Sequence, residues 1–447
     1  MNPLRPATAQ SLPTAFHVMT KPIGPICNLD CRYCFYLEKE ELYKPERNKH
    51  PSWQMPDDVL EAYIRQYIEG QNAPEISFAW QGGEPTLLGV RFFRRVVELQ
   101  KRYANGKTIQ NALQTNGTLL NNEWGAFLRD NNFLVGLSLD GPRALHDAYR
   151  VDKKGSGSFD RVMAGLAVLQ NHEIEFNTLT VVSRVNSRHP LETYRFLREV
   201  GSGFIQFIPL VERSSFAPLQ TENGLISLAL TPPGRNGSRS PVTEWSVQSD
   251  DWGGFLCTIF DEWVRRDVGT TFVQLFDVAL GVWAGLEASL CVFRPTCGDA
   301  LAIEHNGDVY SCDHYVYPEY RLGNVRDTPI AELVTTPQQI KFGQDKQSTL
   351  PRYCQECDVR FACHGECPKH RFLRAPSGEW GLNYLCAGYK RFFRHIDPYM
   401  QAMTNLLHAG RAPQEITALI AQQDRDEAAA QYEHAMVAGS VQTARAY

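Results

Sequence analysis

Three cysteines near the amino terminus have the residue type and the spacing to hold an iron–sulfur cluster. Cys27, Cys31 and Cys34 follow the pattern C-x3-C-x2-C, and thiolates are the ligands that such clusters prefer. A four-iron cluster has four iron corners and this segment offers three thiolates, so the fourth iron would stay open to a small chelating molecule. A zinc site that takes one ligand from elsewhere is the alternative, although zinc sites usually show paired C-x2-C halves.

Eight further cysteines lie in the carboxyl-terminal part of the chain, at Cys291, Cys297, Cys312, Cys354, Cys357, Cys363, Cys367 and Cys386. Eight thiolates are what two fully ligated four-iron clusters require. Two zinc sites of four thiolates each would use the same number. Cys257 fits neither pattern, and a buried packing thiol is the better interpretation of it.

The amino-terminal motif, with Tyr33 before its last cysteine, resembles the signature of radical S-adenosylmethionine enzymes. In that family the amino and carboxylate groups of S-adenosylmethionine bind the open iron. An electron from the reduced cluster then releases a 5′-deoxyadenosyl radical, which abstracts a hydrogen atom. The carboxyl-terminal cysteines, with Gly307 between Cys297 and Cys312, match the SPASM extension of the same family.

Longer segments resemble one subgroup, the anaerobic sulfatase-maturating enzymes, from about Phe16 to Tyr399. They are C-N-L-D-C-R-Y-C-F-Y from residue 27, Q-G-G-E-P-T from residue 81, L-Q-T-N-G-T-L from residue 113, L-V-G-L-S-L-D-G-P from residue 134 and N-G-D-V-Y-S-C-D-H-Y-V from residue 306. The resemblance implies oxidation of one Ser or Cys side chain, in a Cys/Ser-x-Pro-x-Arg segment of an unfolded sulfatase, to Cα-formylglycine. Two other functions compete: crosslinking of a ribosomal peptide by a different SPASM enzyme, and a non-enzymatic electron-transfer or zinc-binding role.

The same resemblance implies S-adenosylmethionine and three four-iron clusters as cofactors. The cluster that binds S-adenosylmethionine would be held by Cys27, Cys31 and Cys34. The first auxiliary cluster would be held by Cys291, Cys297, Cys312 and Cys367, and the second by Cys354, Cys357, Cys363 and Cys386. The implied partners are a sulfatase polypeptide and an electron donor of the flavodoxin or ferredoxin type.

Roles for other side chains also follow from the resemblance. Asp313 matches the base that takes a proton from the target, and partial desolvation beside a cluster is expected to raise its pKa. Gln81 matches a contact with the peptide. The expected contacts with S-adenosylmethionine are Tyr36, Gly82, Gly83, Glu84, Asn116, Ser138 and Arg150, since adjacent glycines admit a ligand close to the backbone, a carboxylate can hold an ammonium group, and the planar fork of arginine fits a carboxylate.

These residues must be positioned by a regular framework, and the apolar spacing predicts one. Strands are expected near residues 16–23, 76–80, 108–114, 134–139, 176–182 and 204–210, with helices between them near 55–68, 92–103, 122–129, 159–171 and 190–200. Strands that alternate with helices indicate a parallel sheet, and six are too few for a closed eight-unit barrel. We therefore expect an α/β fold with an open, partial (βα)6 barrel whose functional groups gather at the carboxyl ends of the strands.

The composition suggests how the rest of the chain is organised. We expect a loose tail over residues 1–15, the barrel with a polar linker over 16–248, bridging helices over 249–290, the SPASM domain over 291–398, and a solvated polar helical tail over 399–447.

The 447 residues are 43% hydrophobic and 21% charged, with a net charge of −5. This balance is that of a soluble globular protein and gives no general attraction to nucleic acid. We find no apolar run of about 18 residues that would predict a membrane span. Many cysteines without an export signal favour metal or redox sites over disulfides and a cytoplasmic location.

Overall fold

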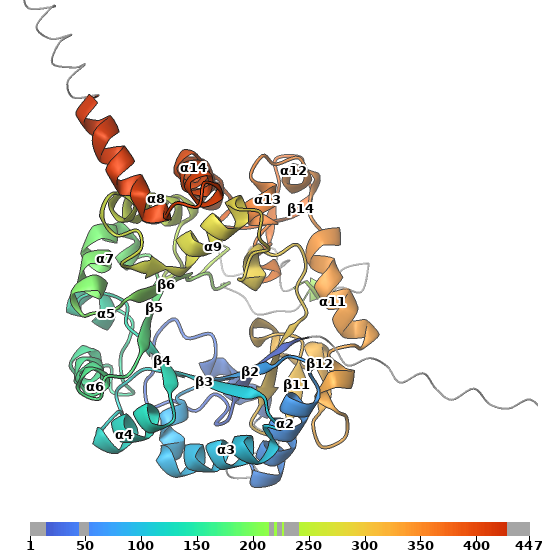
Figure 1. The fold of residues 1–447 in the computed structure, drawn as a ribbon. Coiled ribbons are helices and arrows are strands. Elements are labelled where there is room, and N and C mark those ends of the chain that lie inside the picture. Colours follow the sequence, from blue (N-terminus) through green and yellow to red (C-terminus); the bar gives the residue numbers. More distant parts are fainter. Residues whose placement is uncertain (1–14, 44–52, 214–218, 221–225, 228–240, 427–447) are drawn as a thin grey trace, which may run out of the picture.

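The computed structural model describes residues 15–43, 53–213, 219–220, 226–227 and 241–426. Its centre is a sheet of ten strands in the order β12-β11-β10-β1-β2-β3-β4-β5-β6-β9 (Figure 1). The strands are β1 (His17–Lys21), β2 (Glu75–Trp80), β3 (Thr108–Thr115), β4 (Phe133–Ser138), β5 (Phe176–Val182), β6 (Phe204–Pro209), β9 (Phe272–Val273), β10 (Ala300–Glu304), β11 (Asp308–Tyr310) and β12 (Arg321–Asn324).

The six predicted strands pair in parallel and in chain order, as expected for a partial barrel. The helices along them are α2 (Asp57–Glu69), α3 (Gly89–Tyr103), α4 (Asn122–Asp130), α5 (Arg143–Asp147), α6 (Phe159–Asn171) and α7 (Pro190–Glu199). All but the short α5 were predicted. The side chain of Asn121 accepts a hydrogen bond from the backbone N–H of Trp124 and so caps α4 at its start.

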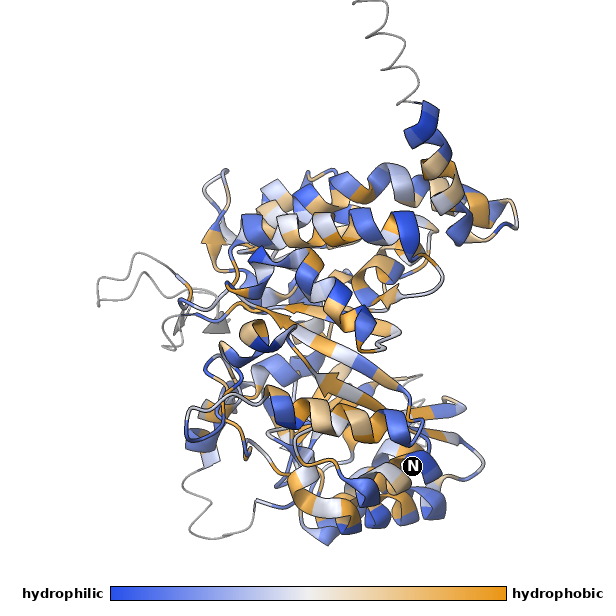
Figure 2. Cartoon of the chain, turned by 90° about the vertical axis from the view of Figure 1, so that its left-hand side faces the viewer, coloured by the Kyte–Doolittle hydropathy of each residue, from blue (hydrophilic) through white to orange (hydrophobic). Residues whose placement is uncertain are grey.

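The core lies between the sheet and these helices. Along α2, apolar side chains recur at helical spacing and are buried: Val59, Leu60, Tyr63, Ile64, Tyr67 and Ile68. Tyr63 among them contacts the buried rings of Phe78 and Trp80 on β2. In Figure 2 the central strands are largely orange, whereas the helices carry blue residues beside orange ones. Hydrophobic burial between the helices and the sheet therefore fixes the strands and the residues at their ends.

The segment that carries Cys297 and Cys312 continues the barrel sheet, which the sequence did not reveal. β10 pairs in parallel with β1, from His17 opposite Ala300 to Lys21 opposite Glu304. β11 and β12 then add antiparallel strands beyond it. This pairing joins segments far apart in the chain, so no local pattern announces it.

The carboxyl-terminal helices differ from the predicted solvated tail. α14 (Cys386–His408) runs through Pro398, the expected boundary, and packs against α8 (Ser249–Arg266). Beyond that proline, buried side chains continue at Met400, Met403, Leu406, Ile416 and Ile420. These buried side chains therefore extend the core beyond Pro398, while other residues of this segment, such as Leu407 and Leu419, are exposed.

The remaining helices and strands are α9 (Gln274–Trp283), α10 (Ile330–Leu333), α11 (Pro337–Ser348), α12 (Arg352–Gln355), α13 (Arg360–Cys363), β13 (Leu373–Arg374), β14 (Trp380–Leu382), β7 (Leu219–Gln220) and β8 (Ile226–Ser227). The predicted amino-terminal tail except residue 15, most of the predicted linker after residue 213, and residues 427–447 lie outside the described residues. Within the described ranges, no helix combines the length and the apolar character needed to cross a bilayer.

Candidate active site

The three-cysteine loop follows β1 at its carboxyl end, where the barrel was expected to gather its functional groups. Backbone hydrogen bonds from Asp30 N–H to Val151 and from Arg32 N–H to Tyr149 fasten the loop to the segment after α5. Burial raises the pKa of the Cys27 and Cys31 thiols to about 12. Cys34 lies near enough to contribute to both shifts. Iron binding must therefore displace these protons.

The loop fits the cluster that the sequence implies. The potential metal ligands that lie near one another in this loop are the thiols of Cys27, Cys31 and Cys34. Thiolates are the ligands of iron–sulfur clusters. No group of three or more His, Cys, Asp or Glu side chains in the described ranges is close enough to surround a single metal ion. A four-iron cluster spreads its thiolates around a cube, so its ligands need only enclose a space of that size.

The Q-G-G-E-P segment after β2 lies directly against the cysteine loop. Gly83 N–H donates to the carbonyl of Gly24 at 2.8 Å, and Glu84 N–H donates to that of Ile26 at 2.9 Å. A Cβ on Gly83 would lie 2.0 Å from the Ile26 oxygen, and Gly82 has a φ of +136°. Only glycines permit this contact.

Glu84 is fully buried and its carboxylate is already bonded within the protein. Oε1 accepts hydrogen bonds from Thr86 N–H, Thr86 Oγ1 and Thr115 Oγ1, and Oε2 accepts one from Asn116 N–H at 2.7 Å. Burial raises its pKa even though these donors oppose the shift. The carboxylate thus joins the loops after β2 and β3, whereas its expected contact with an ammonium group stays a prediction.

Asn116 and Ser138 lie at the ends of β3 and β4. The Asn116 amide donates to Asn28 Oδ1 at 2.9 Å and lies 3.8 Å from the Cys27 sulfur. Ser138 Oγ accepts from the Gln114 amide at 3.2 Å. Asn116 thus contacts the cysteine loop itself, and its contact with the cofactor stays a prediction.

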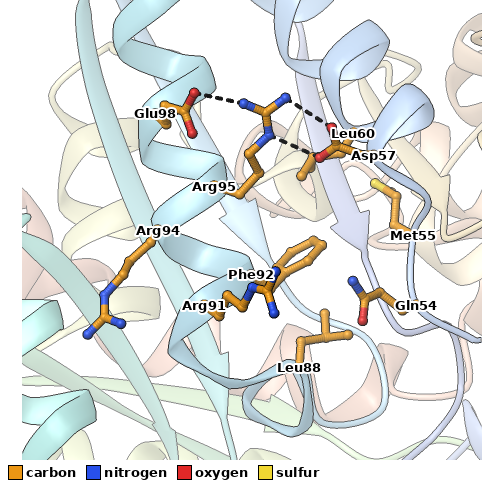
Figure 3. A pocket seen from close by; sticks show the side chains of 10 residues that line it. All are labelled: Gln54, Met55, Asp57, Leu60, Leu88, Arg91, Phe92, Arg94, Arg95 and Glu98. Atoms are coloured by element: carbon orange, nitrogen blue, oxygen red, sulfur yellow. Dashed lines mark hydrogen bonds and ion pairs between the residues drawn. The ribbon is translucent and has the colours of Figure 1, made fainter.

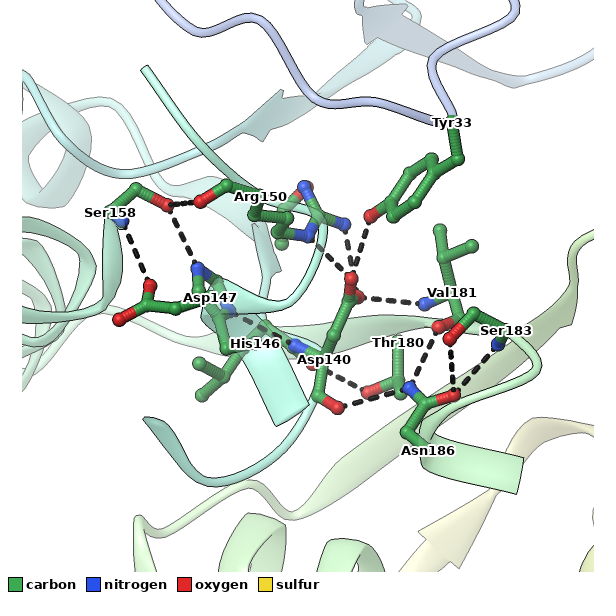
Figure 4. A network of polar contacts seen from close by, with 12 residues as sticks. Tyr33, Asp140, His146, Asp147, Arg150, Ser158, Thr180, Val181, Ser183 and Asn186 are labelled. Carbon is green, nitrogen blue, oxygen red and sulfur yellow. Dashed lines mark hydrogen bonds and ion pairs between the residues drawn. The ribbon is translucent and has the colours of Figure 1, made fainter. Parts of the chain in front are cut away.

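Arg150 is buried, and its guanidinium group forms an ion pair with Asp140 (Figure 4). Its Nε and Nη2 donate to the two carboxylate oxygens at 2.8 and 3.1 Å. The Tyr33 hydroxyl donates to Asp140 Oδ2 at 2.6 Å, and Val181 N–H to Oδ1 at 2.9 Å. Asp140, which was not among the predicted site residues, therefore ties the cysteine loop to β5. Arg150 is paired with this carboxylate, and its expected contact with the cofactor carboxylate stays a prediction.

Three of the predicted residues meet around a lysine that the sequence analysis missed. Lys21 ends β1, and its Nζ forms an ion pair with Asp313 Oδ1 at 2.5 Å. Nζ also donates to Gln81 Oε1 at 2.8 Å and lies 4.6 Å from the centre of the Tyr36 ring. The sequence feature that could have revealed Lys21 is a lysine at the end of a largely apolar strand, just before the cysteine motif.

The expected rise in the pKa of Asp313 is wrong. Burial alone would raise it, but Lys21, His314 and Lys369 together hold the pKa of this carboxyl below its ordinary value. A carboxylate next to an ammonium group is stabilised in its charged form. Asp313 is therefore ionised at neutral pH.

Glu304 lies beside this group, at the end of β10. It is fully buried, accepts a hydrogen bond from the Tyr36 hydroxyl, and has its Oε2 3.5 Å from His305 Nδ1. Burial raises the pKa of Glu304. Tyr36 is thus fixed by β10, which explains why a residue of the cysteine loop faces the SPASM segment.

The assignment of the eight other motif cysteines to two clusters stays a prediction, and the neighbours of each thiol bear on it. Burial is the main cause that raises the pKa of Cys312 and of Cys297; Cys367 and Cys291 contribute to the rise for Cys312, and Cys291 to that for Cys297. The thiols of the second group line one cavity: Cys354, Cys357, Cys363 and Cys386. Cys257 is buried on α8, as expected for a packing thiol.

A larger cavity lies elsewhere, between α2 and α3 on the outer side of the barrel (Figure 3). It has a volume of about 710 Å³ and is lined by no predicted site residue. Arg95 is paired there with Asp57 and Glu98. This cavity belongs to the helical layer and not to the candidate active site.

Comparison with known proteins decides the family. Residues 22–197 match the Radical SAM superfamily, and residues 291–358 match the SPASM iron-sulfur cluster-binding domain. The serine-type anaerobic sulfatase-maturating enzyme of Bacteroides thetaiotaomicron is 47% identical over 400 residues, which cover 90% of this chain and 94% of that one. The chain belongs to the anaerobic sulfatase-maturating enzymes.

Other anaerobic sulfatase-maturating enzymes agree with this assignment. The cysteine-type enzyme of Clostridium perfringens is 34% identical over 87% of this chain and 98% of its own length. The solved structure described as native anSMEcpe with bound AdoMet and Kp18Cys peptide has a TM-score of 0.74 and 32% identity, and it covers 87% of this chain and 99% of that one. The expected partial barrel with a SPASM extension is thereby confirmed.

Proposed function

We propose that this anaerobic sulfatase-maturating enzyme oxidises one serine or cysteine side chain of a sulfatase polypeptide to Cα-formylglycine. The observation that carries the proposal is the group formed by Lys21, Asp313, Gln81 and Tyr36 beside the three-cysteine loop. A carboxylate and an amide beside the cysteine loop support a base and a peptide contact next to the site of radical formation. The peptide-bound structure of the similar anSMEcpe supports a peptide substrate.

Serine is the target that similarity favours. The serine-type relative from Bacteroides thetaiotaomicron is 47% identical to this chain, and the cysteine-type relative from Clostridium perfringens is 34% identical. We therefore take a Ser-x-Pro-x-Arg segment as the first substrate to test.

The cofactors proposed are S-adenosylmethionine and three four-iron clusters. When bound on the cluster held by Cys27, Cys31 and Cys34, S-adenosylmethionine supplies the 5′-deoxyadenosyl radical that removes a hydrogen atom from the target Cβ. The two groups of four cysteines would hold the auxiliary clusters, which supply an exit for the remaining electron. The grouping of the thiols supports this assignment.

The residues around the cofactor have two kinds of role. The backbone of Gly82 and Gly83, with Asn116 and Ser138 at the neighbouring strand ends, binds S-adenosylmethionine. Glu84 acts by locking the loops together, since its four hydrogen bonds are internal. The same holds for Arg150, which fixes the cysteine loop through the carboxylate of Asp140.

Asp313 is the base of the reaction. Loss of a hydrogen atom from Cβ leaves one proton and one electron to be removed before the aldehyde forms. The ionised carboxylate accepts the proton of the target hydroxyl, and Gln81 binds the peptide beside it. General bases of this kind contribute about 10²- to 10⁴-fold to a rate.

We place the protein in the cytoplasm, with a flavodoxin- or ferredoxin-type donor that reduces the first cluster. All twelve cysteines are free thiols in the structure, which suits a reducing compartment. The first cluster would need an electron donor of low reduction potential. Small iron–sulfur proteins and flavoproteins are electron carriers of this kind.

The proposal is tested by anaerobic reconstitution with iron and sulfide, reduction, and addition of S-adenosylmethionine and a Ser-x-Pro-x-Arg peptide. Mass spectrometry should show a peptide that has lost two hydrogens and reacts with a hydrazine. If 5′-deoxyadenosine forms and no peptide is changed, the substrate assignment is wrong. If an iron-loaded sample makes neither product, the enzymatic function itself is wrong.

A further inference from the structure

Lys21 is a buried ammonium group at the centre of the candidate active site. Its side chain is 2% exposed, whereas that of Asp313 is 20% exposed. A buried ammonium group is costly unless charged or polar partners surround it. The backbone of Lys21 is fixed by strand pairing with β10. Gly82 packs close to it, since a Cβ on Gly82 would lie 3.6 Å from the Lys21 Cα.

One Nζ contacts residues from three separate segments. It meets Asp313 on the segment after Cys312, Gln81 after β2, and the ring of Tyr36 in the cysteine loop. The charges that face it from neighbouring elements include Glu304. That carboxylate, although opposite Lys21 in the strand pairing, is taken by the Tyr36 hydroxyl and approached by His305. The ammonium group is therefore committed to Asp313 and Gln81.

We propose that Lys21 is a positioning residue for the oxidation and sets the orientation of both Gln81 and Asp313 toward the target side chain. This inference rests on the proposed function. A lysine ammonium can only donate hydrogen bonds, so Gln81 must turn its oxygen toward Lys21. Its NH2 group then points away and is available to donate to the peptide.

The same constraint applies to the base. Lys21 holds Asp313 through Oδ1, which leaves Oδ2 for the proton of the target hydroxyl. Without the ammonium group, the Gln81 amide can flip and the Asp313 carboxylate can rotate. A displacement of about 1 Å at reacting groups can cost about a hundredfold in rate. Radical formation at the cysteine loop uses neither group, so it continues without the lysine.

The test compares Lys21→Met, which keeps length and removes the charge, with Lys21→Arg, which keeps the charge. Lys107→Met is the matched control, because Lys107 precedes β3 at the opposite end of the barrel and its Nζ donates to the carbonyls of Ile68 and Gln71. Iron, sulfide, 5′-deoxyadenosine and peptide aldehyde are measured for each variant. The ratio of deoxyadenosine to aldehyde reports how well radical formation is coupled to oxidation, and a purely structural role would not change it.

For Lys21→Met we expect wild-type iron content, deoxyadenosine within about twofold, and aldehyde lower by about ten- to hundredfold. Lys21→Arg should recover part of the coupling, and Lys107→Met should leave the ratio unchanged. If Lys21→Met loses iron, the decision passes to Lys21→Gln, which fills the same space without the charge and should uncouple similarly. An unchanged ratio in a folded, iron-loaded Lys21 variant overturns the assignment alone, whereas a wild-type protein that makes no aldehyde overturns the proposed function with it.

Discussion

At the scale of single residues, the site depends on one buried charge that fixes two polar neighbours. Asp313, Gln81 and Tyr36 could be predicted from motifs because each stands beside a recognisable cysteine or glycine pattern. Lys21 could not, because its importance arises only where the end of β1 meets two distant segments. The predicted direction of the Asp313 pKa shift was wrong for the same reason. The sequence suggested partial burial of Asp313, but it did not indicate that the Lys21 ammonium group lies beside it.

Asp313→Asn should lower aldehyde formation by about a hundredfold or more, because the amide keeps the shape and cannot accept the proton. Production of 5′-deoxyadenosine should stay near the wild-type level, since the base is not needed to form the radical. Chromatography of the nucleoside and mass spectrometry of the peptide measure both. Aldehyde at the wild-type rate would exclude Asp313 as the base.

His146 should make the stability depend on pH. It is fully buried, accepts from Asp140 N–H and contacts Ser158 (Figure 4), and burial lowers its pKa to about 4 from 6.5. The unfolded chain therefore binds more protons between these two values, and stability falls as the pH falls. This histidine alone should remove about 1 kcal/mol of unfolding free energy between about pH 7.5 and about pH 5.5.

Anaerobic urea unfolding across that range measures the effect. In His146→Gln the pH-dependent loss should be smaller by about 1 kcal/mol, whatever the stability of the variant at neutral pH. An equal slope for both proteins would show that the histidine is not held neutral in the fold.

At the scale of elements, apolar spacing predicted the helices and strands whose formation depends on local packing. The helices along the barrel were found because each buries one face on the sheet, as α2 does. The strands were found because they are short apolar runs between helices. The packing of the Q-G-G-E-P segment onto the cysteine loop could not be measured from sequence, although two adjacent glycines pointed to a close approach.

Gly83→Ala should separate these two loops. The new Cβ would lie 2.0 Å from the Ile26 oxygen, a contact that only backbone movement can relieve. We expect loss of S-adenosylmethionine cleavage and of about one third of the iron, because one of three clusters depends on this loop. Gly203→Ala is the control, since a Cβ there meets nothing within 4 Å. Full iron content with normal cleavage in Gly83→Ala would contradict the close packing of the loops.

At the scale of the whole molecule, the barrel and the SPASM segment share one sheet. β10 covers the edge of β1 through five paired residues, and α14 packs on α8 from the other end of the chain. The fold class was predictable because the two halves carry separate motifs. Their union was not, because strand pairing over such a sequence separation leaves no local trace.

A fragment that ends at residue 290 should therefore not fold alone. It would expose the β1 edge and the side of α8 that α14 covers. We expect an aggregated product, or one that lacks cooperative unfolding by circular dichroism. A soluble fragment that binds one cluster and unfolds cooperatively would show that the barrel is an independent domain.

The most direct measurement of the central claim uses a Ser-x-Pro-x-Arg peptide whose target serine carries deuterium at Cβ. The reconstituted, reduced protein is given S-adenosylmethionine and this peptide, and both products are analysed by mass spectrometry. Our account predicts that deuterium moves into 5′-deoxyadenosine as the peptide becomes an aldehyde, because the radical takes its hydrogen from that carbon. Deoxyadenosine without deuterium, beside a peptide that keeps its label, would contradict radical oxidation of the serine side chain.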